Sequence, residues 1–226
     1  MNTERLRIAV LCPHFAPDNA PTGAVMTRIV IELAALGHQL HVVTALPWYR
    51  SHAIEFGWEG KWMRRETTEW GSITRVNPFP GSDKRNLVRR ALGFAGFSVL
   101  AGIASIRGGR VDAVIAMSPP LTLGLTGWGT HVIRRGPLIF NIQDVFPDAA
   151  VETGAITNRW VIAGARRLER ISYHRAAAVT ALSADLGDNI AAKMRSSRRG
   201  RVRVIPNFVD TDAIRPQDRM TELRRE

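Results

Sequence analysis

The sequence predicts an α/β fold built on a doubly wound parallel sheet of about seven strands, and three observations carry that prediction. Short runs rich in Val, Ile and Leu alternate with longer stretches of helical periodicity. Most of the short runs are apolar at nearly every position, which is typical of strands buried on both faces. Gly, Pro and Asn residues separate the runs. These features favour strand–helix–strand units in series.

The first of these units opens the chain. Residues 6–12 form an apolar run ended by Pro13, which predicts a buried strand. A helix is expected over residues 22–37, with Gly37 as its C-terminal stop, and residues 40–44 form the next strand. The helix has apolar residues at helical spacing: Val25, Ile29, Leu33 and Leu36.

Residues 46–72 interrupt the alternation and form a long excursion. They contain Trp48, Trp58, Trp62 and Trp70. Indole rings can stack on the apolar faces of sugars, and they can equally pin a loop to the core. The sequence leaves both interpretations open.

The alternation then resumes and continues to residue 205. Strands are expected at residues 73–76, 113–117, 138–142, 177–182 and 202–205, and helices at residues 85–106, 121–134, 158–174 and 183–194. Ser183 is the expected N-cap of the last of these helices. The chain is therefore expected to divide into a domain at residues 1–206 and a linker, with the start of a further domain, at residues 207–226. Residues 219–226 are expected to form the first turns of a helix of that further domain, and the alternative is a frayed terminal helix.

Composition limits the classes of protein that fit. Of 226 residues, 45% are hydrophobic, enough for a substantial core. The single cysteine, Cys12, excludes an internal disulfide and any multi-cysteine metal site, and its place at a strand end favours core packing over a role as nucleophile. The six histidines show no metal-ligand spacing, so we expect no metal. The first residues do not read as a signal peptide, which favours a cytoplasmic location.

The net charge of +11, from 31 Lys and Arg against 20 Asp and Glu, suggests an anionic partner. No nucleic-acid-binding signature is present, so phosphate-bearing substrates and an anionic membrane face rank above nucleic acid. An arginine-rich solvated surface is the alternative. The densest basic block comprises Lys193, Arg195, Arg198, Arg199, Arg201 and Arg203.

Residues 91–106 are apolar nearly all round and follow a basic stretch. The run is too short to span a bilayer, which needs about 20 residues. One interpretation is a helix buried against the sheet. The other is a peripheral membrane contact in which Phe94, Phe97 and Leu100 enter the lipid interface beside flanking arginines.

Ligands of open parallel sheets bind beyond the carboxyl ends of the strands. There the sequence places the loop before Gly23 and Ala24, Ser118, the pair Gln143 and Asp144, and Ser183. Backbone N–H groups at the helix start near Gly23 can bind an anion, although a cap is the simpler explanation. No G-x-G-x-x-G or P-loop pattern is present, which disfavours nicotinamide, flavin and P-loop enzymes.

Gln143-Asp144 directly follows a buried strand. The Asp144 carboxylate is well placed to accept a proton from a sugar hydroxyl or to orient it. The alternative for Asp144 is an N-cap of the next turn, and capping is the favoured role of Asp148.

Three segments occur in a characteristic order: Ser118-Pro119-Pro120, residues 143–151 with Gly154, and residues 204–210 followed by Arg215-Pro216. Together they resemble the N-terminal domain of family 4 glycosyltransferases, one Rossmann-like half of a GT-B fold. The resemblance is strongest to the bacterial polysaccharide and O-antigen type, which includes colanic acid and N-acetylfucosamine transferases.

This resemblance implies a retaining transfer of a hexose-type sugar from a nucleotide diphosphate sugar to a glycan acceptor, often lipid-linked. It implies that Gly23 and Ala24 approach the diphosphate, that Asp144 lines the reaction cleft, and that Asn207 and Asp210 belong to the hinge before the second domain. Besides the nucleotide sugar, no cofactor or metal is expected.

Two departures from the family pattern matter. Many relatives carry His before the cleft Asp, whereas this chain has Gln143, whose amide can still hydrogen-bond a hydroxyl. The family's donor-binding half would begin just after residue 226. The isolated chain is therefore expected to transfer sugar negligibly. If the protein is peripheral to a membrane, the expected location is the inner face of the plasma membrane.

Two other functions stay open. The first is a truncated, non-catalytic module that binds glycan or lipid or joins a separate donor-domain chain. The second is a sugar epimerase of the same fold or another nucleotide-binding protein, which the segments around Asp144 and Asn207 disfavour.

Overall fold

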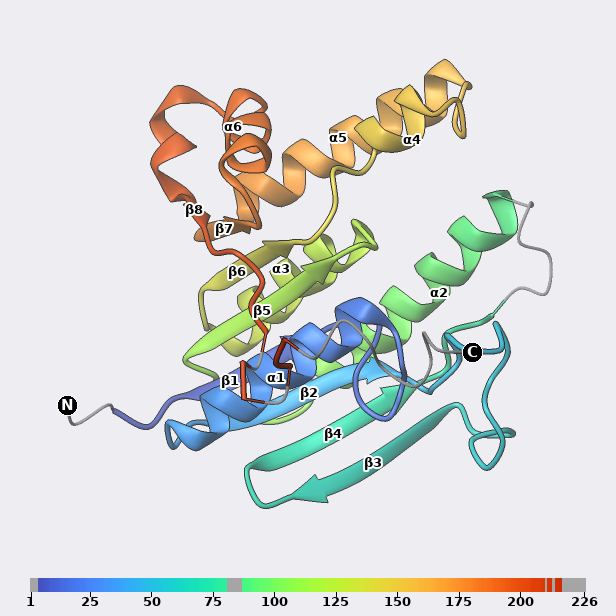
Figure 1. Ribbon diagram of the computed structural model, residues 1–226, viewed down its shortest axis with the longest axis vertical. Helices are drawn as coiled ribbons and strands as arrows, with labels where there is room; N and C mark the ends of the chain where they lie inside the picture. Colours follow the sequence, from blue (N-terminus) through green and yellow to red (C-terminus); the bar gives the residue numbers. More distant parts are fainter. Residues whose placement is uncertain (1–3, 81–86, 210, 213, 217–226) are drawn as a thin grey trace.

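The computed structural model describes residues 4–80, 87–209, 211–212 and 214–216. One sheet of eight strands organises them, in the order β3-β4-β2-β1-β5-β6-β7-β8 (Figure 1). Every neighbouring pair is parallel except β3 and β4. The predicted doubly wound α/β fold is confirmed, with one more strand than expected.

The elements follow the expected alternation closely. The strands are β1 (Arg7–Leu11), β2 (Gln39–Ala45), β3 (Met63–Thr68), β4 (Gly71–Val76), β5 (Ala113–Ser118), β6 (Leu138–Ile142), β7 (Ala178–Ala181) and β8 (Val202–Val204). The helices are α1 (Pro21–Ala35), α2 (Leu87–Ser105), α3 (Thr122–Arg134), α4 (Asp148–Glu152), α5 (Arg159–Arg175) and α6 (Ala184–Ala192), with the 3-10 turn η1 (Ser196–Arg201). The helix expected at residues 219–226 lies outside the described residues.

The extra strand is β3, inside the segment expected to be an irregular excursion. Its sequence, MRRETT, lacks the apolar run that marks the central strands. β3 pairs only with β4, antiparallel and at the edge of the sheet, so it needs no fully apolar face.

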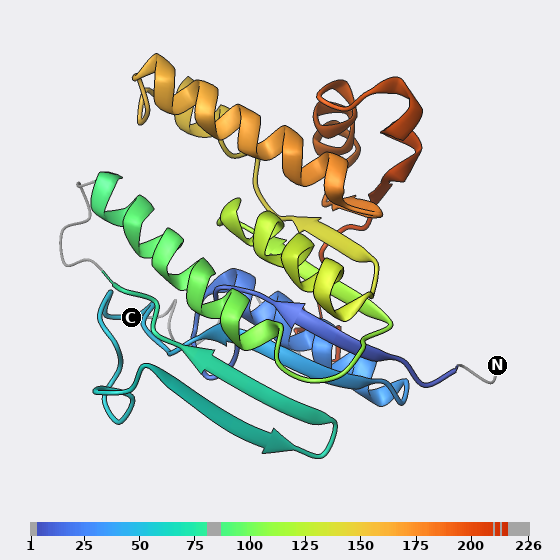
Figure 2. The same cartoon turned by 180° about the vertical axis from the view of Figure 1, so that it is seen from behind.

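Helices cover both faces of the sheet. α1 packs on one face, where Met26 and Val30 meet Ile8, Val10 and Val42. α2, α3 and α5 cover the opposite face, which is turned toward the viewer in Figure 2. The central strands are therefore buried on both sides, as their apolar runs predict.

α2 is a sheet-covering helix, as the first of the two interpretations proposed. Phe97 is 2% exposed and Leu100 packs against the core, so these two of the three residues expected to enter lipid are directed into the protein, while Phe94 is half-buried. The outer surface of α2 nevertheless exposes the large apolar side chains of Leu92, Val99 and Ile103, and Ile106 is exposed directly after the helix. Within the described part of the chain, no helix is long and apolar enough to cross a membrane.

Candidate functional site

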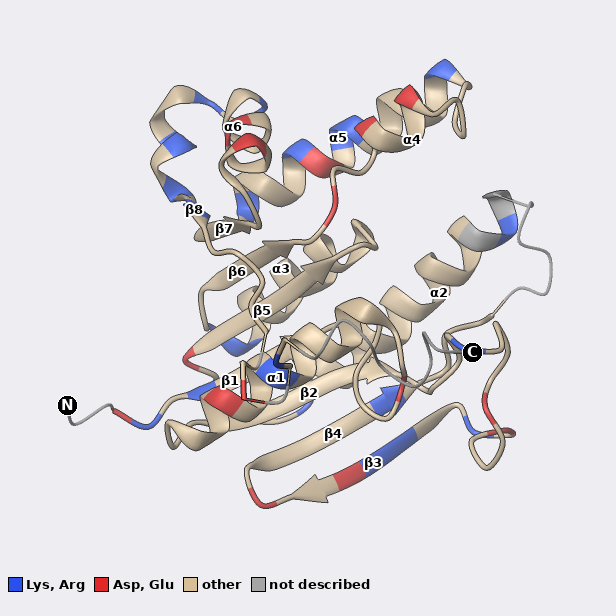
Figure 3. Cartoon of the chain, viewed as in Figure 1, with Lys and Arg blue, Asp and Glu red and all other residues tan. Residues whose placement is uncertain are grey.

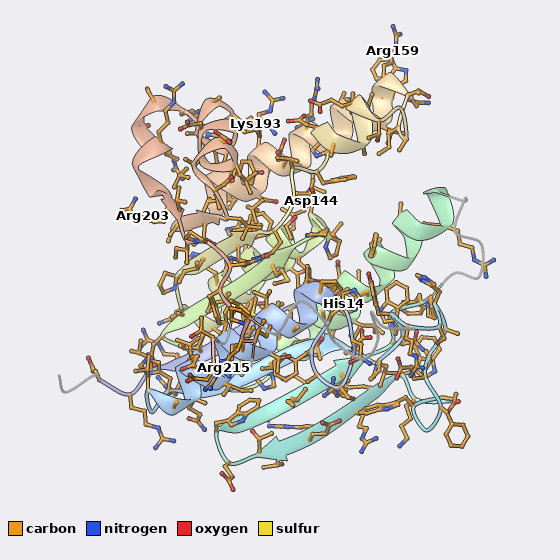
Figure 4. All side chains as sticks on the ribbon, viewed as in Figure 1. His14, Asp144, Arg159, Lys193, Arg203 and Arg215 are labelled. Atoms are coloured by element: carbon orange, nitrogen blue, oxygen red, sulfur yellow. The ribbon has the colours of Figure 1, made fainter. Side chains whose placement is uncertain are left out.

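The order of the strands reverses at β1. From β1 the chain proceeds outward to β2 on one side, and it later returns to β5 on the other side. The loops after β1 and β5 therefore flank the switch point, where open α/β sheets bind their ligands. This edge is the candidate site, and His14 and Asp144 mark it in Figure 4.

The loop after β1 contains a histidine–carboxylate pair. Nδ1 of His14 lies 2.6 Å from Oδ2 of Asp18, whose side chain is fully buried. Oδ1 of Asp18 accepts a second hydrogen bond, at 3.1 Å, from the backbone N–H of Tyr49. Asp18 is thus held from two sides and fixes the orientation of the imidazole. Sequence reasoning missed this pair, because a four-residue spacing in a loop gives no sign of contact.

Two aromatic residues after β2 enclose His14. Its ring stacks on Trp48, with centroids 5.6 Å apart and planes 27° from parallel. Tyr49 meets the same ring edge-on at 5.3 Å. Trp48 therefore lies beside the candidate site, while Trp70 packs on Phe15 and joins the core. Trp48 also packs against the core, and stacking of these tryptophans on sugar stays a prediction.

Arg75 of β4 ties the first loop to the sheet. The side chain is 1% exposed, its Nε lies 3.0 Å from Oε1 of Glu66, and Nη2 donates to the carbonyl of Ala16 at 2.5 Å. Its guanidinium also lies 5.1 Å from the ring of Trp58. One buried cation therefore joins β4, β3, the excursion and the loop that carries His14.

The structure gives Gly23 a packing role. A Cβ at this position would lie 2.9 Å from Cβ of His14 and 3.3 Å from the carbonyl oxygen of Asp18. Glycine is thus needed for α1 to approach the loop. The N–H of Ala24 donates to the carbonyl of Ala20 inside the first turn, so this amide is already used. Contact of either residue with phosphate stays a prediction.

Gln143 belongs to a chain of amide hydrogen bonds across the carboxyl edge. Its Nε2 donates to Oδ1 of Asn141 at 2.7 Å, and Nδ2 of Asn141 donates to Oγ1 of Thr180 at 2.8 Å. Oε1 of Gln143 accepts from Nδ2 of Asn207 at 3.0 Å. The structure thus brings two of the predicted site residues, Gln143 and Asn207, together.

Asp144 is exposed, and its Oδ1 accepts a hydrogen bond from the N–H of Val145 at 2.8 Å. It is not the N-cap of α4, whose capping residue is Pro147. Asp148 does not cap α4 either. Its carboxylate lies 2.6 Å from Nζ of Lys193, and although burial opposes the effect, this contact lowers the pKa of Asp148.

The remaining predicted positions differ in their exposure, and Ser183 is exposed whereas Ser118 is buried. Ser118 is 1% exposed, and its Oγ has no partner among the described residues. Ser183 is the N-cap of α6, as expected, and its Oγ accepts from the N–H of Leu186. Asp210 lies outside the described residues. Burial raises the pKa of Cys12 to about 12, which keeps it a thiol and agrees with a packing role.

No group of three or more His, Cys, Asp or Glu side chains able to hold a metal ion occurs in the described ranges. The chemistry available at the carboxyl edge is therefore that of an oriented imidazole, an exposed carboxylate and amide groups. These groups bind hydroxyls and can accept their protons.

Comparison with known proteins gives a family and a fold. The family model described as "Glycosyl transferase 4-like domain" matches residues 22–207. No curated protein sequence matches significantly. Sucrose-phosphate synthase from Thermosynechococcus elongatus is similar in structure, with a TM-score of 0.65 at 13% identity over 94% of this chain and 51% of that one.

A weaker similarity is to HepE from Anabaena, solved in complex with UDP-glucose. The TM-score is 0.49 at 14% identity, over 92% of this chain and 45% of that one. The chain thus spans about half the length of the solved structures that it matches.

Proposed function

The chain belongs to the glycosyl transferase 4-like domain family, and we propose that it is the acceptor-side half of a retaining glycosyltransferase. The reaction moves a hexose-type sugar from a nucleotide diphosphate sugar to a lipid-linked glycan, in cell-surface polysaccharide synthesis of the O-antigen or colanic acid type. The observation that carries the proposal is the family match over residues 22–207, which includes α1, the loop after β5 and the segment from Gln143 to Asn207.

On the acceptor side, the proposal assigns the chemistry to Asp144 and His14. The acceptor hydroxyl oxygen forms the new glycosidic bond, the sugar–phosphate bond breaks, and the hydroxyl proton must be taken up. With the Nδ1–H of His14 donated to Asp18, its Nε2 is free to accept or orient that hydroxyl. Asp144, two residues after β6, supplies an exposed carboxylate. Ser118, Gln143 and Ser183 are proposed to surround the acceptor.

On the donor side, Gly23 and Ala24 are proposed to face the diphosphate, but two backbone positions cannot neutralise it. Transition-state stabilisation in such a reaction comes mainly from groups that bind the leaving charge. The proposal therefore places these groups on a second Rossmann-like domain, beyond the domain at residues 1–206. Asn207 and Asp210, in the linker at residues 207–226, are its hinge.

The first test compares purified 1–226 with the same chain joined to, or mixed with, a donor-binding domain. Release of nucleoside diphosphate and labelling of a lipid-linked glycan are measured with a panel of nucleotide sugars. We expect negligible transfer by 1–226 alone and transfer when the second domain is present. Full transfer by 1–226 alone contradicts the half-enzyme proposal, whereas glycan binding that no second domain converts into transfer favours a non-catalytic binding module.

The second test uses the active two-domain protein. Asp144→Asn is expected to lower kcat by about 100-fold or more, because it removes a group that handles the acceptor proton. Asp188→Asn, an exposed carboxylate on α6, is the matched control and should leave kcat unchanged. Equal activity of the two variants would remove Asp144 from the mechanism.

We further propose peripheral attachment to the inner face of the plasma membrane. The apolar outer surface of α2 and the net positive charge of the chain support this proposal. Flotation with liposomes, with and without anionic lipid, tests it. Failure to float in both cases, at low salt as well as high, contradicts it.

A further inference from the structure

A second concave site lies at the opposite edge of the sheet, at the amino ends of β1, β2 and β4. It is a cavity of about 380 Å³ beside the end of α2. Its polar lining comprises Arg7, Gln39, His41, Arg65, Thr67, Ser72, Thr74, Arg107, Arg110 and Arg134. A volume of this size suits a small ligand.

The cavity exists because α2 ends before it covers the whole face of the sheet. Val43 and Val76 are buried on this face with Ala104 of α2. His41 and Thr74 lie two residues earlier on the same strands, and so point to the same face. Arg65 is the β3 partner of Thr74. A longer α2 would cover these three positions and would require apolar side chains there. Because His41, Thr74 and Arg65 are polar, they line the cavity instead.

The positive charge of the cavity is only partly compensated. Five of its lining residues are arginines, and none of the described lining residues is Asp or Glu. Arg134 is only 7% exposed, and its guanidinium donates to the carbonyl oxygens of Gly109, at 2.8 Å, and Ser105, at 3.0 Å. Asp112, which pairs with Arg7, is exposed and lies outside the lining. Buried cations are usually paired, so this arrangement leaves room for an anion.

The local electrostatics agree with that geometry. Burial, together with the positive charges of Arg134 and Arg65, lowers the pKa of His41 to about 4. The imidazole is held by Oγ of Ser72 at 2.7 Å and forms part of the cavity wall. His41 is thus neutral near pH 7 and experiences the field of two guanidinium groups.

We propose that this cavity binds a compact phosphate-bearing ligand, held by Arg65 and Arg107 from its rim and by Arg134 from its wall. Guanidinium groups bind phosphate through paired, charge-assisted hydrogen bonds. The site is separate from the proposed sugar transfer, since it lies at the other edge of the sheet. The phosphate can belong to a soluble metabolite or to a phospholipid headgroup, because Ile103 and Ile106, neighbours in sequence of the lining residues Ala104 and Arg107, are exposed.

The experiment measures binding of inorganic phosphate and pyrophosphate to the chain by calorimetry, with chloride at equal ionic strength as reference. Wild type should bind at least one of them saturably. Arg65→Gln/Arg107→Gln should weaken binding about tenfold or more, because two charge-assisted contacts are lost. Both arginines are exposed, so the variant should fold. Arg199→Gln, an exposed arginine on η1 outside the cavity, is the control and should bind like wild type.

Two further readouts locate the site and the source of the phosphate. Bound anion should raise the pKa of His41 above about 4, followed by NMR of its ring protons, because an anion favours the charged imidazole. In a vesicle arm, wild type and the double variant are sedimented with phosphatidic acid vesicles. Vesicle binding that depends on the two arginines, without binding of free phosphate, assigns the site to a headgroup. Binding of free phosphate without this vesicle effect assigns it to a soluble compound.

Two results would overturn the proposal. The first is that neither the free anions nor the vesicles bind in a way that depends on Arg65 and Arg107. The second is that phosphate binds wild type and leaves the pKa of His41 unchanged. In either case the arginines are only a solvated basic surface.

Discussion

The two edges of the sheet handle charge in opposite ways. At the carboxyl edge, ionisable and amide groups are paired inside the protein: His14 with Asp18, Arg75 with Glu66, and Gln143 with Asn207. At the amino edge, five arginines line one cavity without a carboxylate among its described lining residues. Figure 3 marks the basic and acidic residues along the ribbon, including those of β3. The difference suggests that the carboxyl edge holds its own side chains in fixed positions, whereas the amino edge can bind an anion from solution.

The comparison is sharpest between two arginines on the β3–β4 hairpin. Arg75→Ala removes a buried guanidinium that holds Glu66 and the carbonyl of Ala16, and should lower the free energy of unfolding by about 3 kcal/mol or more. Arg65→Ala removes an exposed arginine of the cavity and should change it by less than about 0.5 kcal/mol. Chemical denaturation measures both values. Equal losses would show that the two edges do not differ in this way.

The pH dependence of stability tests the amino edge. The pKa of His41 is about 4 in the folded chain against an ordinary value of 6.5, so the unfolded chain binds more protons between these values. Stability should therefore fall as pH decreases from 6.5 to 4, by at most about 3 kcal/mol. In His41→Gln the slope in this window should flatten. Saturating phosphate should flatten it as well, and identical slopes for wild type and variant would contradict the lowered pKa of His41.

A glycine pair tests how tightly the carboxyl edge is packed. Gly23→Ala places a Cβ against His14 and Asp18, and should cost about 1–3 kcal/mol of stability. Gly164→Ala, in α5 with no atom within 4 Å of the new Cβ, should stabilise the chain by up to about 1 kcal/mol. Thermal unfolding of the two variants measures the contrast. A neutral Gly23→Ala would mean that the loop after β1 yields easily.

The smallest expected effect concerns Cys12, directly after β1. Because burial raises the pKa of its thiol to about 12, alkylation at pH 8 should require unfolding. Labelling in native buffer should thus be slow, and it should accelerate in denaturant and in Gly23→Ala. Rapid labelling of the native wild-type chain would show that this edge opens readily.

The sequence predicted the central strands well and the edge of the sheet poorly, for one physical reason. A strand buried on both faces must be apolar, as Val114, Ala116 and their neighbours in β5 are. An edge strand such as β3 needs no such run, because water solvates one side of it. The helix caps at Asn158 and Ser183 were predictable because capping depends on local sequence.

The candidate site was predictable only where it follows the topology. The carboxyl ends of parallel strands meet at one edge, so Gln143 could be assigned to it from the sequence, whereas Asn207 was expected only as part of the hinge. The pair His14 and Asp18 could not, because it depends on how the loop folds against Tyr49 and Arg75. The packing role of Gly23 could not be predicted either, because it too depends on how this loop folds against α1.

Both outer strands of the sheet also affect how the protein behaves in concentrated solution. At one border, β3 has Arg64, Arg65 and Glu66 in succession, and at the other β8 is three residues long with Arg203 at its centre. Unpaired strand edges are templates for the sheets of other molecules, and charged or very short border strands oppose that pairing. The fold therefore includes protection against strand-mediated aggregation, so the chain should stay dispersed at concentrations at which a smooth apolar border would lead to fibres.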